Sequence, residues 1–493
     1  MNIKYIWLFI LLIAFTACND IEDVLEDNNV NTSNEILPEL TSGSADFSNY
    51  VALGNSLTAG FTDNALFIAA QENSMPNLLS QKFALVGGGS FSQPMMNDNI
   101  GGLLFGGNTM PNGSFGPRLY FNGAGPAVLP GMPTTETFAP SNGPYNNMGV
   151  PGAASFHLLF DGYGNPNFLE AGLANPYFVR MASAQNATVL GDALAQSPTF
   201  VSLWIGNNDV LGYATSGGST GAITSQAMFE GSINAIVGAL QQAGVKGVMA
   251  NIPDVTSIPY FTTVPYNPVP LDAATAGALN QGYAAYNGGL QQALAVLGPL
   301  GLITEDEVAR RTISFSAGEG NALVIIDENL TDLGAINPAF AALPQYRQAT
   351  EEDLFVLTLS SLIPQGYGTQ IPLEDKWSLT PEEQMEIKLA TDSFNATLAA
   401  AASQAGFAFV DANTLMLQLA DGSFSSGDYT PTASLVTGGL FSLDGVHPTA
   451  RGYALLANEF MKAIDATYGS NFEASGNLLN VGQYPTNYSP LLQ

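Results

Sequence analysis

The serine at position 56 stands where a chain could place a reactive hydroxyl. Residues 49–53 end in a short apolar run that suits a buried strand, and Gly54 and Asn55 then break it. From residue 57 onward the composition suits the first turns of a helix. A serine at a sharp turn from strand to helix exposes its hydroxyl and leaves its backbone N–H free to face a ligand. We therefore interpret Ser56 as a candidate nucleophile, although Gly-Asn-Ser is also an ordinary turn sequence.

The chain contains only 2 histidines, so an imidazole base for Ser56 must be one of them. His447 follows Asp444 by three residues on one predicted loop, and a carboxylate at that spacing can accept a hydrogen bond from the ring Nδ1–H. Pro448 biases His447 toward an extended conformation and suits the start of a helix. His157 lies in an apolar run without an adjacent acid. We predict His447 as the base, and His157 as part of a helix face or pocket wall.

Two further turns carry groups that could stabilise a negatively charged oxygen. Residues 147–153 form a glycine-rich turn, in which Gly152 has no side chain and lets a reacting group approach its N–H. Residues 206–209, Gly-Asn-Asn-Asp, follow a strand predicted over residues 197–205. The carboxyl ends of strands are where α/β sheets place their active sites. The alternatives are an ordinary helix-entry turn and an ordinary strand-end cap.

Together these motifs resemble the four sequence blocks of the SGNH (GDSL-like) hydrolases, in the same order. They are Gly54-Asn55-Ser56-Leu57, Gly152, Gly206-Asn207-Asn208-Asp209 and Asp444-Gly445-Val446-His447. The resemblance spans residues 51–448. It implies a flavodoxin-like three-layer α/β/α fold with a parallel sheet, and ester hydrolysis through an acyl-enzyme.

The resemblance also implies a role for each matching residue. Ser56 would be the nucleophile, His447 the base, and Asp444 the acid that orients the base. The oxyanion hole would consist of the backbone N–H groups of Ser56 and Gly152 and the side-chain amide of Asn208. This chemistry requires neither a metal nor an organic cofactor.

Two details of the match concern glycine and asparagine. Gly152 rather than Gly149 fits the family spacing, because the family glycine follows an asparagine, here Asn147, by five residues. Asn55 replaces the usual aspartate of the first block. Asparagine keeps the shape and an acceptor oxygen but loses the charge, so we expect a local structural change without loss of activity.

Alternating strands and helices predict the parallel sheet that would position these residues. Strands are expected over residues 49–53, 197–205, 246–252 and 407–410, and helices over residues 228–243, 381–402 and 449–468. Residues 87–145 and 254–376 interrupt the pattern and are predicted as insertions in a domain that spans residues 47–468. We expect the second insertion to form a subdomain over one end of the sheet. Aromatic residues of the first could line an apolar pocket or only pin the segment to the body.

The composition is strongly acidic, with 12 Lys+Arg against 42 Asp+Glu among 493 residues and a formal charge of −30. Electrostatic binding to nucleic acid or to an anionic bilayer surface is therefore excluded. We expect a monomer. The single cysteine excludes an intramolecular disulfide and a multi-thiolate metal site. Residues 161–165, Asp-Gly-Tyr-Gly-Asn, could hold Ca²⁺, but such clusters are usually turns.

Residues 1–18 resemble a bacterial lipoprotein signal peptide. Lys4 supplies a positive charge, residues 5–15 are apolar but too short to span a bilayer, and Phe-Thr-Ala-Cys ends at Cys18. Cys18 would be lipidated and become the mature N-terminus; the alternative is an ordinary secretory signal. An acidic tether over residues 19–46, similar to the surface-export tags of Bacteroidetes-type lipoproteins, and a tail over residues 469–493 complete the predicted organisation. We expect an outer-membrane lipoprotein of the cell envelope that faces the periplasm or the cell surface, held by its lipid anchor alone.

The sequence thus predicts a serine-dependent hydrolase of carboxylic acyl esters, of the lipase or esterase type. Three other functions stay open: a deacetylase of O-acylated glycans on the same site, an acyltransferase on the same scaffold, and a non-catalytic lipoprotein that binds glycans or lipids. The pure binder is disfavoured, because binding alone does not need the pair of Asp444 and His447. Acyl length and leaving group are not specified at this level.

Overall fold

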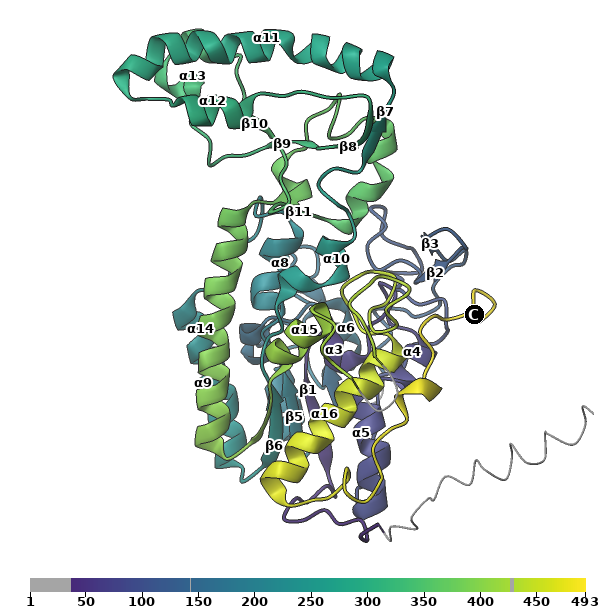
Figure 1. Cartoon of the computed structure of the whole chain (residues 1–493). Coiled ribbons are helices and arrows are strands. Elements are labelled where there is room, and N and C mark those ends of the chain that lie inside the picture. Colours follow the sequence, from purple (N-terminus) through teal and green to yellow (C-terminus); the bar gives the residue numbers. More distant parts are fainter. Residues whose placement is uncertain (1–36, 142, 426–429) are drawn as a thin grey trace, which may run out of the picture.

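Five parallel strands form the central sheet of the protein, seen here in a computed structural model that describes residues 37–141, 143–425 and 430–493 (Figure 1). The strands are β1 (Tyr50–Gly54), β4 (Asn147–Gly149), β5 (Phe200–Trp204), β6 (Lys246–Ala250) and β13 (Ala408–Val410). Their order across the sheet is β4-β1-β5-β6-β13, and every neighbouring pair is parallel. Numbered along the chain, this is the order 2-1-3-4-5 of flavodoxin-like sheets. The predicted three-layer α/β fold is confirmed.

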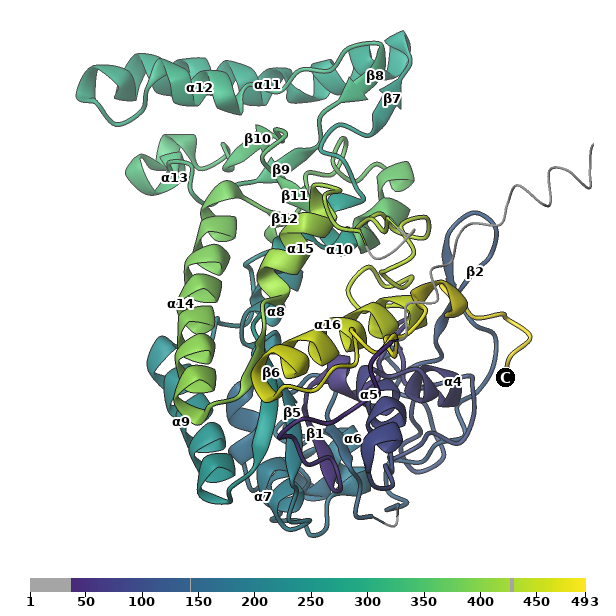
Figure 2. The ribbon, with the colours of Figure 1, turned by 60° about the horizontal axis from the view of Figure 1, so that its bottom comes forward.

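Helices cover both faces of the sheet, which explains why its strands read as continuous apolar runs. Side chains alternate between the two faces along a strand. Val51 and Leu53 of β1 therefore join the apolar cluster on one face, whereas Ala52 joins the cluster on the other. α7 (Val189–Leu194), α9 (Gln226–Gln242) and α14 (Pro381–Ala405) cover the first face, and α5 (Met75–Phe83) and α16 (Ala450–Tyr468) cover the second (Figure 2).

Local sequence fixes the ends of the two longest helices of these layers. Thr449 caps α16, because its side chain accepts a hydrogen bond from the N–H of Gly452. The helix therefore begins where the loop that carries the predicted base ends. Thr380 and Glu383 form a capping box at the start of α14, and Gly406 ends that helix in the left-handed conformation, with φ of 67°.

Short helices connect the layers around the site. They are α3 (Ser56–Ala59), α4 (Ile68–Glu72), α6 (Pro176–Met181), α8 (Asn208–Thr215), α10 (Pro259–Thr262) and α15 (Ala412–Ala420). The helical region expected after Ser56 is broken, because Gly60 ends α3 in the left-handed conformation, with φ of 84°.

The inserted segment at residues 87–145 is mostly irregular and contains the antiparallel hairpin of β2 (Leu119–Phe121) and β3 (Pro126–Val128). Its aromatic residues pin it to the body. Phe91 stacks on Tyr50 of β1, with 5.2 Å between the ring centroids. Phe105 and Phe115 pack together beside α6. Of the two roles considered for these rings, the structure shows the pinning one.

Residues 254–376 build a second lobe with an apolar core of its own. Its helices and strands are α11 (Ala273–Leu297), α12 (Glu305–Arg311), α13 (Leu333–Ile336), β7 (Val269–Leu271), β8 (Gly318–Asn321), β9 (Val324–Ile326) and β10 (Tyr346–Gln348). The core of the lobe includes Leu290, Val308 and Val324. β11 (Leu354–Phe355) pairs with β12 (Ser378–Leu379) where the chain returns to α14. Both views place the lobe beyond α8 and α10, at the end of the sheet where β5 leads into α8 (Figures 1 and 2).

Both ends of the described chain pack on the body. Ala45 is buried, and the N–H of Thr41 donates to the side chain of Asn471. Phe472 is fully buried in the cluster under α16, and Tyr488 is buried against α4. The last residues of the expected tether over residues 19–46 thus contact the body, and the expected tail over residues 469–493 contributes buried residues to it. Cys18 and the signal segment lie outside the described residues, among which no helix has the length and apolarity to cross a bilayer.

Candidate active site

Ser56 lies at the turn from β1 into α3, the position expected for it. Asn55 caps the helix, because its side-chain oxygen accepts from the N–H of Leu57 at 3.0 Å. Gly54 allows the strand to pass closely beside β5, since a Cβ atom on it would come within 2.3 Å of the carbonyl oxygen of Trp204. Ser56 is 8 % exposed, and its backbone N–H has no acceptor within the part of the chain that the structure describes.

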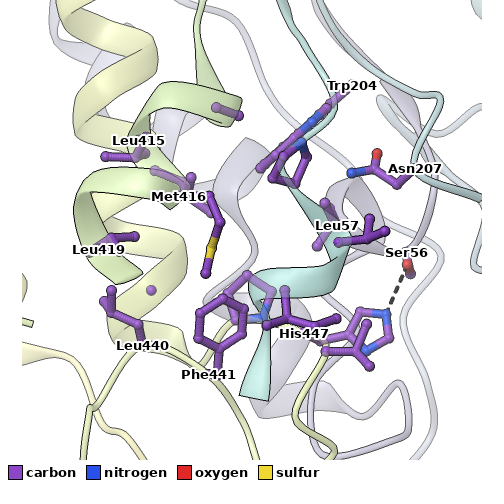
Figure 3. Close-up of a pocket in the computed structure, with 18 of the residues that line it drawn as sticks. Ser56, Leu57, Trp204, Asn207, Leu415, Met416, Leu419, Leu440, Phe441 and His447 are labelled. Carbon is purple, nitrogen blue, oxygen red and sulfur yellow. Dashed lines mark hydrogen bonds between the residues drawn. The ribbon is translucent and has the colours of Figure 1, made fainter. Parts of the chain in front are cut away.

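The three predicted catalytic residues are joined by two hydrogen bonds, although Ser56 and His447 are 391 positions apart in the sequence. His447 Nε2 lies 2.9 Å from Ser56 Oγ (Figure 3), and His447 Nδ1 lies 2.9 Å from Asp444 Oδ2. The other carboxylate oxygen, Asp444 Oδ1, accepts from the N–H groups of Val446 and His447 at 2.8 Å each. Gly445 makes this tight loop possible in the left-handed conformation, with φ of 73°.

The charge on Asp444 fixes the tautomer of the imidazole. Burial opposes that charge, but the attraction of His447 and the hydrogen bonds from His447 and Val446 outweigh burial and lower the pKa of Asp444 to about 2. An ionised Asp444 can only accept, so His447 Nδ1 carries the proton and Nε2 is the acceptor that faces the Ser56 hydroxyl. This arrangement can remove a proton from Ser56.

His157 is placed away from this chemistry. Its Nδ1 accepts a hydrogen bond from the N–H of Ala154, and its ring stacks on Tyr163 with 4.5 Å between centroids. Burial lowers the pKa of His157 to about 4, so the ring is neutral at physiological pH. It lies on the short 3-10 helix Ser155–Leu159, as one of its two predicted placements, a helix face, requires.

Of the predicted oxyanion groups, Ser56 and Asn208 line one pocket, and Asn208 is bonded to the residue that follows Gly152. Asn208, the first residue of α8, donates one amide hydrogen to the carbonyl oxygen of Ala153 at 2.9 Å, which leaves the second hydrogen to donate elsewhere. Gly152 is exposed in the left-handed conformation, with φ of 83°, and its N–H finds no acceptor in the described part of the chain. Asp209 holds this loop in place, since its carboxylate accepts from both the N–H and the hydroxyl of Ser155.

The asparagine that replaces the usual aspartate has a structural use of its own. Asn55 is fully buried, and its Nδ2 donates to the side-chain oxygen of Asn207 at 2.9 Å. Its Oδ1 caps α3 at the same time. The amide thus ties the turn that carries Ser56 to the turn that carries Asn208.

An apolar pocket opens beside Ser56 and His447 (Figure 3). It encloses about 810 Å³ of space free of atoms, its open mouth included. The walls away from Ser56 are formed by Leu415, Met416, Leu419, Leu440 and Phe441 (Figure 3). Sequence reasoning missed these residues. The available signal was the apolar face of α15, whose residues 415, 416 and 419 recur at helical spacing.

A separate acidic cluster lies where the lobe meets α14. Carboxylate oxygens of Glu328, Asp375 and Glu383 lie within 4.8 Å of one another. Burial raises the pKa of Glu383 to about 7, and burial together with Glu328 raises the pKa of Asp375 to about 6. Residues 161–165, the segment considered for Ca²⁺ from its sequence, form turns, and Asn165 caps a short 3-10 helix there.

The raised pKa values predict that stability falls as the pH rises. The folded protein binds more protons at these carboxyls than the unfolded chain does, so their contribution is present at low pH and is lost as the pH rises through about 6 to 7. Melting temperatures of wild type and Glu383→Gln, compared at about pH 5 and about pH 8, should show a smaller pH dependence in the variant. Equal dependence in both proteins would contradict the assignment to this cluster.

No family model matches the chain, and neither does any curated protein. Among solved structures the chain is similar to LAE5, an alpha/beta hydrolase enzyme from the metagenome of Lake Arreo, Spain. The identity is 11%, the TM-score is 0.33, and the match covers 88% of this chain and 98% of that one. It is also similar to an extracellular lipase from Streptomyces rimosus, at 12% identity and a TM-score of 0.29 over 85% of this chain and 99% of the lipase. At these scores the function has to be inferred from the geometry of the site itself.

Proposed function

We propose that the protein is a serine-dependent hydrolase of carboxylic acyl esters, related in mechanism to the SGNH (GDSL-like) hydrolases. The observation that carries this proposal is the unbroken hydrogen-bond chain from Asp444 through His447 to Ser56 Oγ, at the mouth of a pocket. A serine hydroxyl is a weak nucleophile at neutral pH unless a base removes its proton as it attacks. The geometry supplies that base and orients it.

The proposed cycle has two halves. Ser56 Oγ attacks the ester carbonyl while His447 Nε2 takes its proton, and the charge that develops on the former carbonyl oxygen is stabilised by the N–H groups of Ser56 and Gly152 and the amide of Asn208. His447 then gives the proton to the departing alcohol, which leaves the acyl group on Ser56. Water, activated by the same histidine, attacks the acyl-enzyme and releases the acid. Every proton and charge of this cycle is held by a protein group, so the proposed cycle uses no metal and no organic cofactor.

A fluorophosphonate probe tests the proposal against a non-catalytic binding protein. Such a probe forms a covalent bond only with an activated serine hydroxyl. Labelling of the wild type at Ser56, shown by peptide mass spectrometry, together with loss of labelling in His447→Ala, is the expected result. A folded wild-type protein that is not labelled would contradict the proposal. The His157→Ala variant is the matched control and should be labelled like the wild type.

Activity should fall on acidification, because His447 must be neutral to accept the serine proton. Asp444 cannot cause the fall, since its pKa of about 2 keeps it ionised throughout. The loss should therefore reflect protonation of His447 alone. Initial rates of ester hydrolysis at constant ionic strength give the profile, and a rate that does not fall on acidification, with chemistry limiting, would exclude an imidazole base.

We further propose that the protein is a lipoprotein of the cell envelope, monomeric, held to the outer membrane through Cys18 and not bound to nucleic acid. The support is the lipoprotein-like segment that ends at the single cysteine, and the strongly acidic composition. Cys18→Ala should move the protein from the membrane fraction to the soluble fraction, because one lipidated cysteine is the only anchor that the sequence provides. Sedimentation of the variant with membranes after a salt wash would contradict this.

A further inference from the structure

The pocket beside Ser56 is polar only at its reactive end. The polar side chains that line it are Ser56, Asn207, Asn208 and His447, apart from Trp204, whose indole N–H already donates to the carbonyl oxygen of Asn251. The remaining lining is apolar and comes from α3, α8, α15, α16 and residues 253–258 and 440–448. A sugar ring in such a pocket would leave its hydroxyl groups without partners, at a cost in free energy.

From this lining, and resting on the proposed hydrolase, we propose that the pocket binds the acyl chain of the ester and that the preferred substrates carry a linear acyl chain much longer than acetyl. Ser56, Leu57 and Asn208 all line the pocket, so a group bonded to Ser56 Oγ enters it with its first carbons. During the cycle the acyl group is the part that stays bonded to Ser56, whereas the alcohol leaves. The wall formed by Met416, Leu419 and Leu440, on the side away from Ser56, meets the end of the chain (Figure 3).

Two series of nitrophenyl and alkyl esters test the proposal on the purified full chain. In the acyl series, from acetate to dodecanoate, each methylene that becomes buried should raise kcat/KM by up to about fourfold, mainly through KM, until the pocket is full. In the alcohol series, acetates of alcohols from methanol to dodecanol, the values should stay within a few-fold. A flat acyl series with clear hydrolysis would overturn the chain-binding proposal while the hydrolase stands. A rise in the alcohol series alone would assign the pocket to the leaving group instead.

A matched pair of substitutions on α15 locates the effect. Met416 lines the pocket, whereas its neighbour Leu417 is 48 % exposed and does not. Met416→Trp should lower kcat/KM for the dodecanoate ester at least tenfold more than kcat/KM for the acetate ester, and Leu417→Trp should change neither value. Equal loss on both esters would overturn the proposal. If Met416→Trp does not fold, binding of dodecanoate to Ser56→Ala, followed through Trp204 fluorescence, replaces it. If dodecanoate does not bind Ser56→Ala saturably, the chain-binding proposal is overturned. This test does not depend on whether the protein hydrolyses esters.

A second observation concerns residues 61–64, which follow α3 in the chain and contact the loop of residues 442–448. The Phe61 ring packs on His447 with 4.7 Å between centroids. Thr62 Oγ1 donates to the carbonyl oxygen of Pro448, and the N–H of Asn64 donates to Asp444 Oδ2 at 2.8 Å. The two segments therefore meet at three residues of the loop, His447, Asp444 and Pro448.

Asp63 is the centre of this contact. Its Oδ1 accepts from the N–H of Leu443 at 3.0 Å, and its own N–H donates to the hydroxyl of Ser442. Its carbonyl oxygen accepts from the N–H of Leu119 in the first insertion. Asp63 and Asn64 both adopt positive φ, 50° and 63°, a strained backbone for residues other than glycine that persists only where the surroundings hold it.

The turn of Asp63 and Asn64 is supported by the first insertion, residues 87–145, and by the C-terminal residues. Arg118 is fully buried, and its guanidinium donates to the carbonyl oxygens of Asn99, Leu119, Ser489 and Leu492. The structure assigns Asp63 as a positioning residue, which acts by fixing the backbone of Leu443 so that Asp444 meets His447. The insertion at residues 87–145 would then serve the reaction by supporting this turn.

Asp63→Ala removes the acceptor for the N–H of Leu443 and should lower kcat about tenfold with KM for a short ester unchanged. Asp63→Asn keeps that acceptor and should retain most of the rate. The proton on His447 Nδ1, seen at low field in the NMR spectrum, should broaden or shift in Asp63→Ala and not in Asp63→Asn. Asp192→Ala, which removes a carboxylate that binds only the backbone and hydroxyl of Ser183 near α7, is the control for a merely structural loss.

Wild-type kcat in Asp63→Ala would overturn the assignment, as would an equal loss in Asp63→Asn. If Asp63→Ala does not fold, the NMR resonance of Asp63→Asn decides. If the resonance of the His447 Nδ1 proton is lost from a folded Asp63→Asn protein, the side-chain oxygen of residue 63 is not what holds Asp444 in place.

Discussion

Ser56→Ala and His447→Ala should each lower kcat for an ester substrate by about a million-fold, and the double variant should be hardly slower than either. The two residues act as one unit, because the proton that Ser56 loses is the proton that His447 gains across the 2.9 Å hydrogen bond. Removing either ends the same step, so the losses do not add. Single-turnover kinetics with a nitrophenyl ester gives the rate of acylation directly.

The control for this pair is His157→Ala, which removes the other imidazole of the chain. His157 bonds only to backbone and stacks on Tyr163, so its replacement should lower stability and leave most of kcat. Loss of turnover in folded His157→Ala, with turnover retained in His447→Ala, would show that the base is His157 and not His447.

Asn208→Ala should lower kcat about 10²–10³-fold with KM nearly unchanged, because an oxyanion donor acts most strongly when charge has developed and little when the ester merely binds. The neighbouring Asn207→Ala is an unusually close control. Each variant removes one hydrogen bond of the turn, from Asn208 to the Ala153 carbonyl or from Asn55 to Asn207. Both should therefore lose similar stability, about 1–3 kcal/mol for a group left buried and unpaired.

The two asparagine variants should differ in kcat alone. If Asn207→Ala loses as much kcat as Asn208→Ala, or if the Asn208→Ala loss lies wholly in KM, Asn208 is a scaffold residue. The oxyanion hole would then consist of the N–H groups of Ser56 and Gly152.

The parts of the molecule that could be predicted are those that local sequence encodes. The strand before Ser56 and the helix after Pro448 follow from apolar runs and caps within a few residues. The base could be predicted because the chain has only 2 histidines, and only one of them, His447, has an acid three residues before it. The sheet order followed from the resemblance and not from the strands themselves.

The parts that could not be predicted depend on contacts between distant segments. The apolar face of α15 reads like any core-facing helix, and only its place opposite Ser56 makes it a pocket wall. Asp63 and Asn64 look like ordinary turn residues, since their use depends on a loop about 380 positions later. The acidic character of residues 19–46 suggested a tether, yet Ala45 and Phe472 bury apolar surface that composition alone does not locate.

The distance along the chain between Ser56 and His447 has a consequence for biosynthesis. The nucleophile belongs to the first strand to be made, whereas the base precedes the last long helix, and the final support for Asp63 comes from residues 489 and 492. Contacts between residues so far apart in sequence form late and slowly, because the entropy of closing the intervening loop is lost before the contact contributes any favourable free energy. A chain whose residues 442–448 have not yet been made therefore lacks the hydrogen-bonded set of Ser56, His447 and Asp444. A chain made only as far as residue 448 still lacks the contacts of Arg118 with residues 489 and 492, which support the turn that contains Asp63.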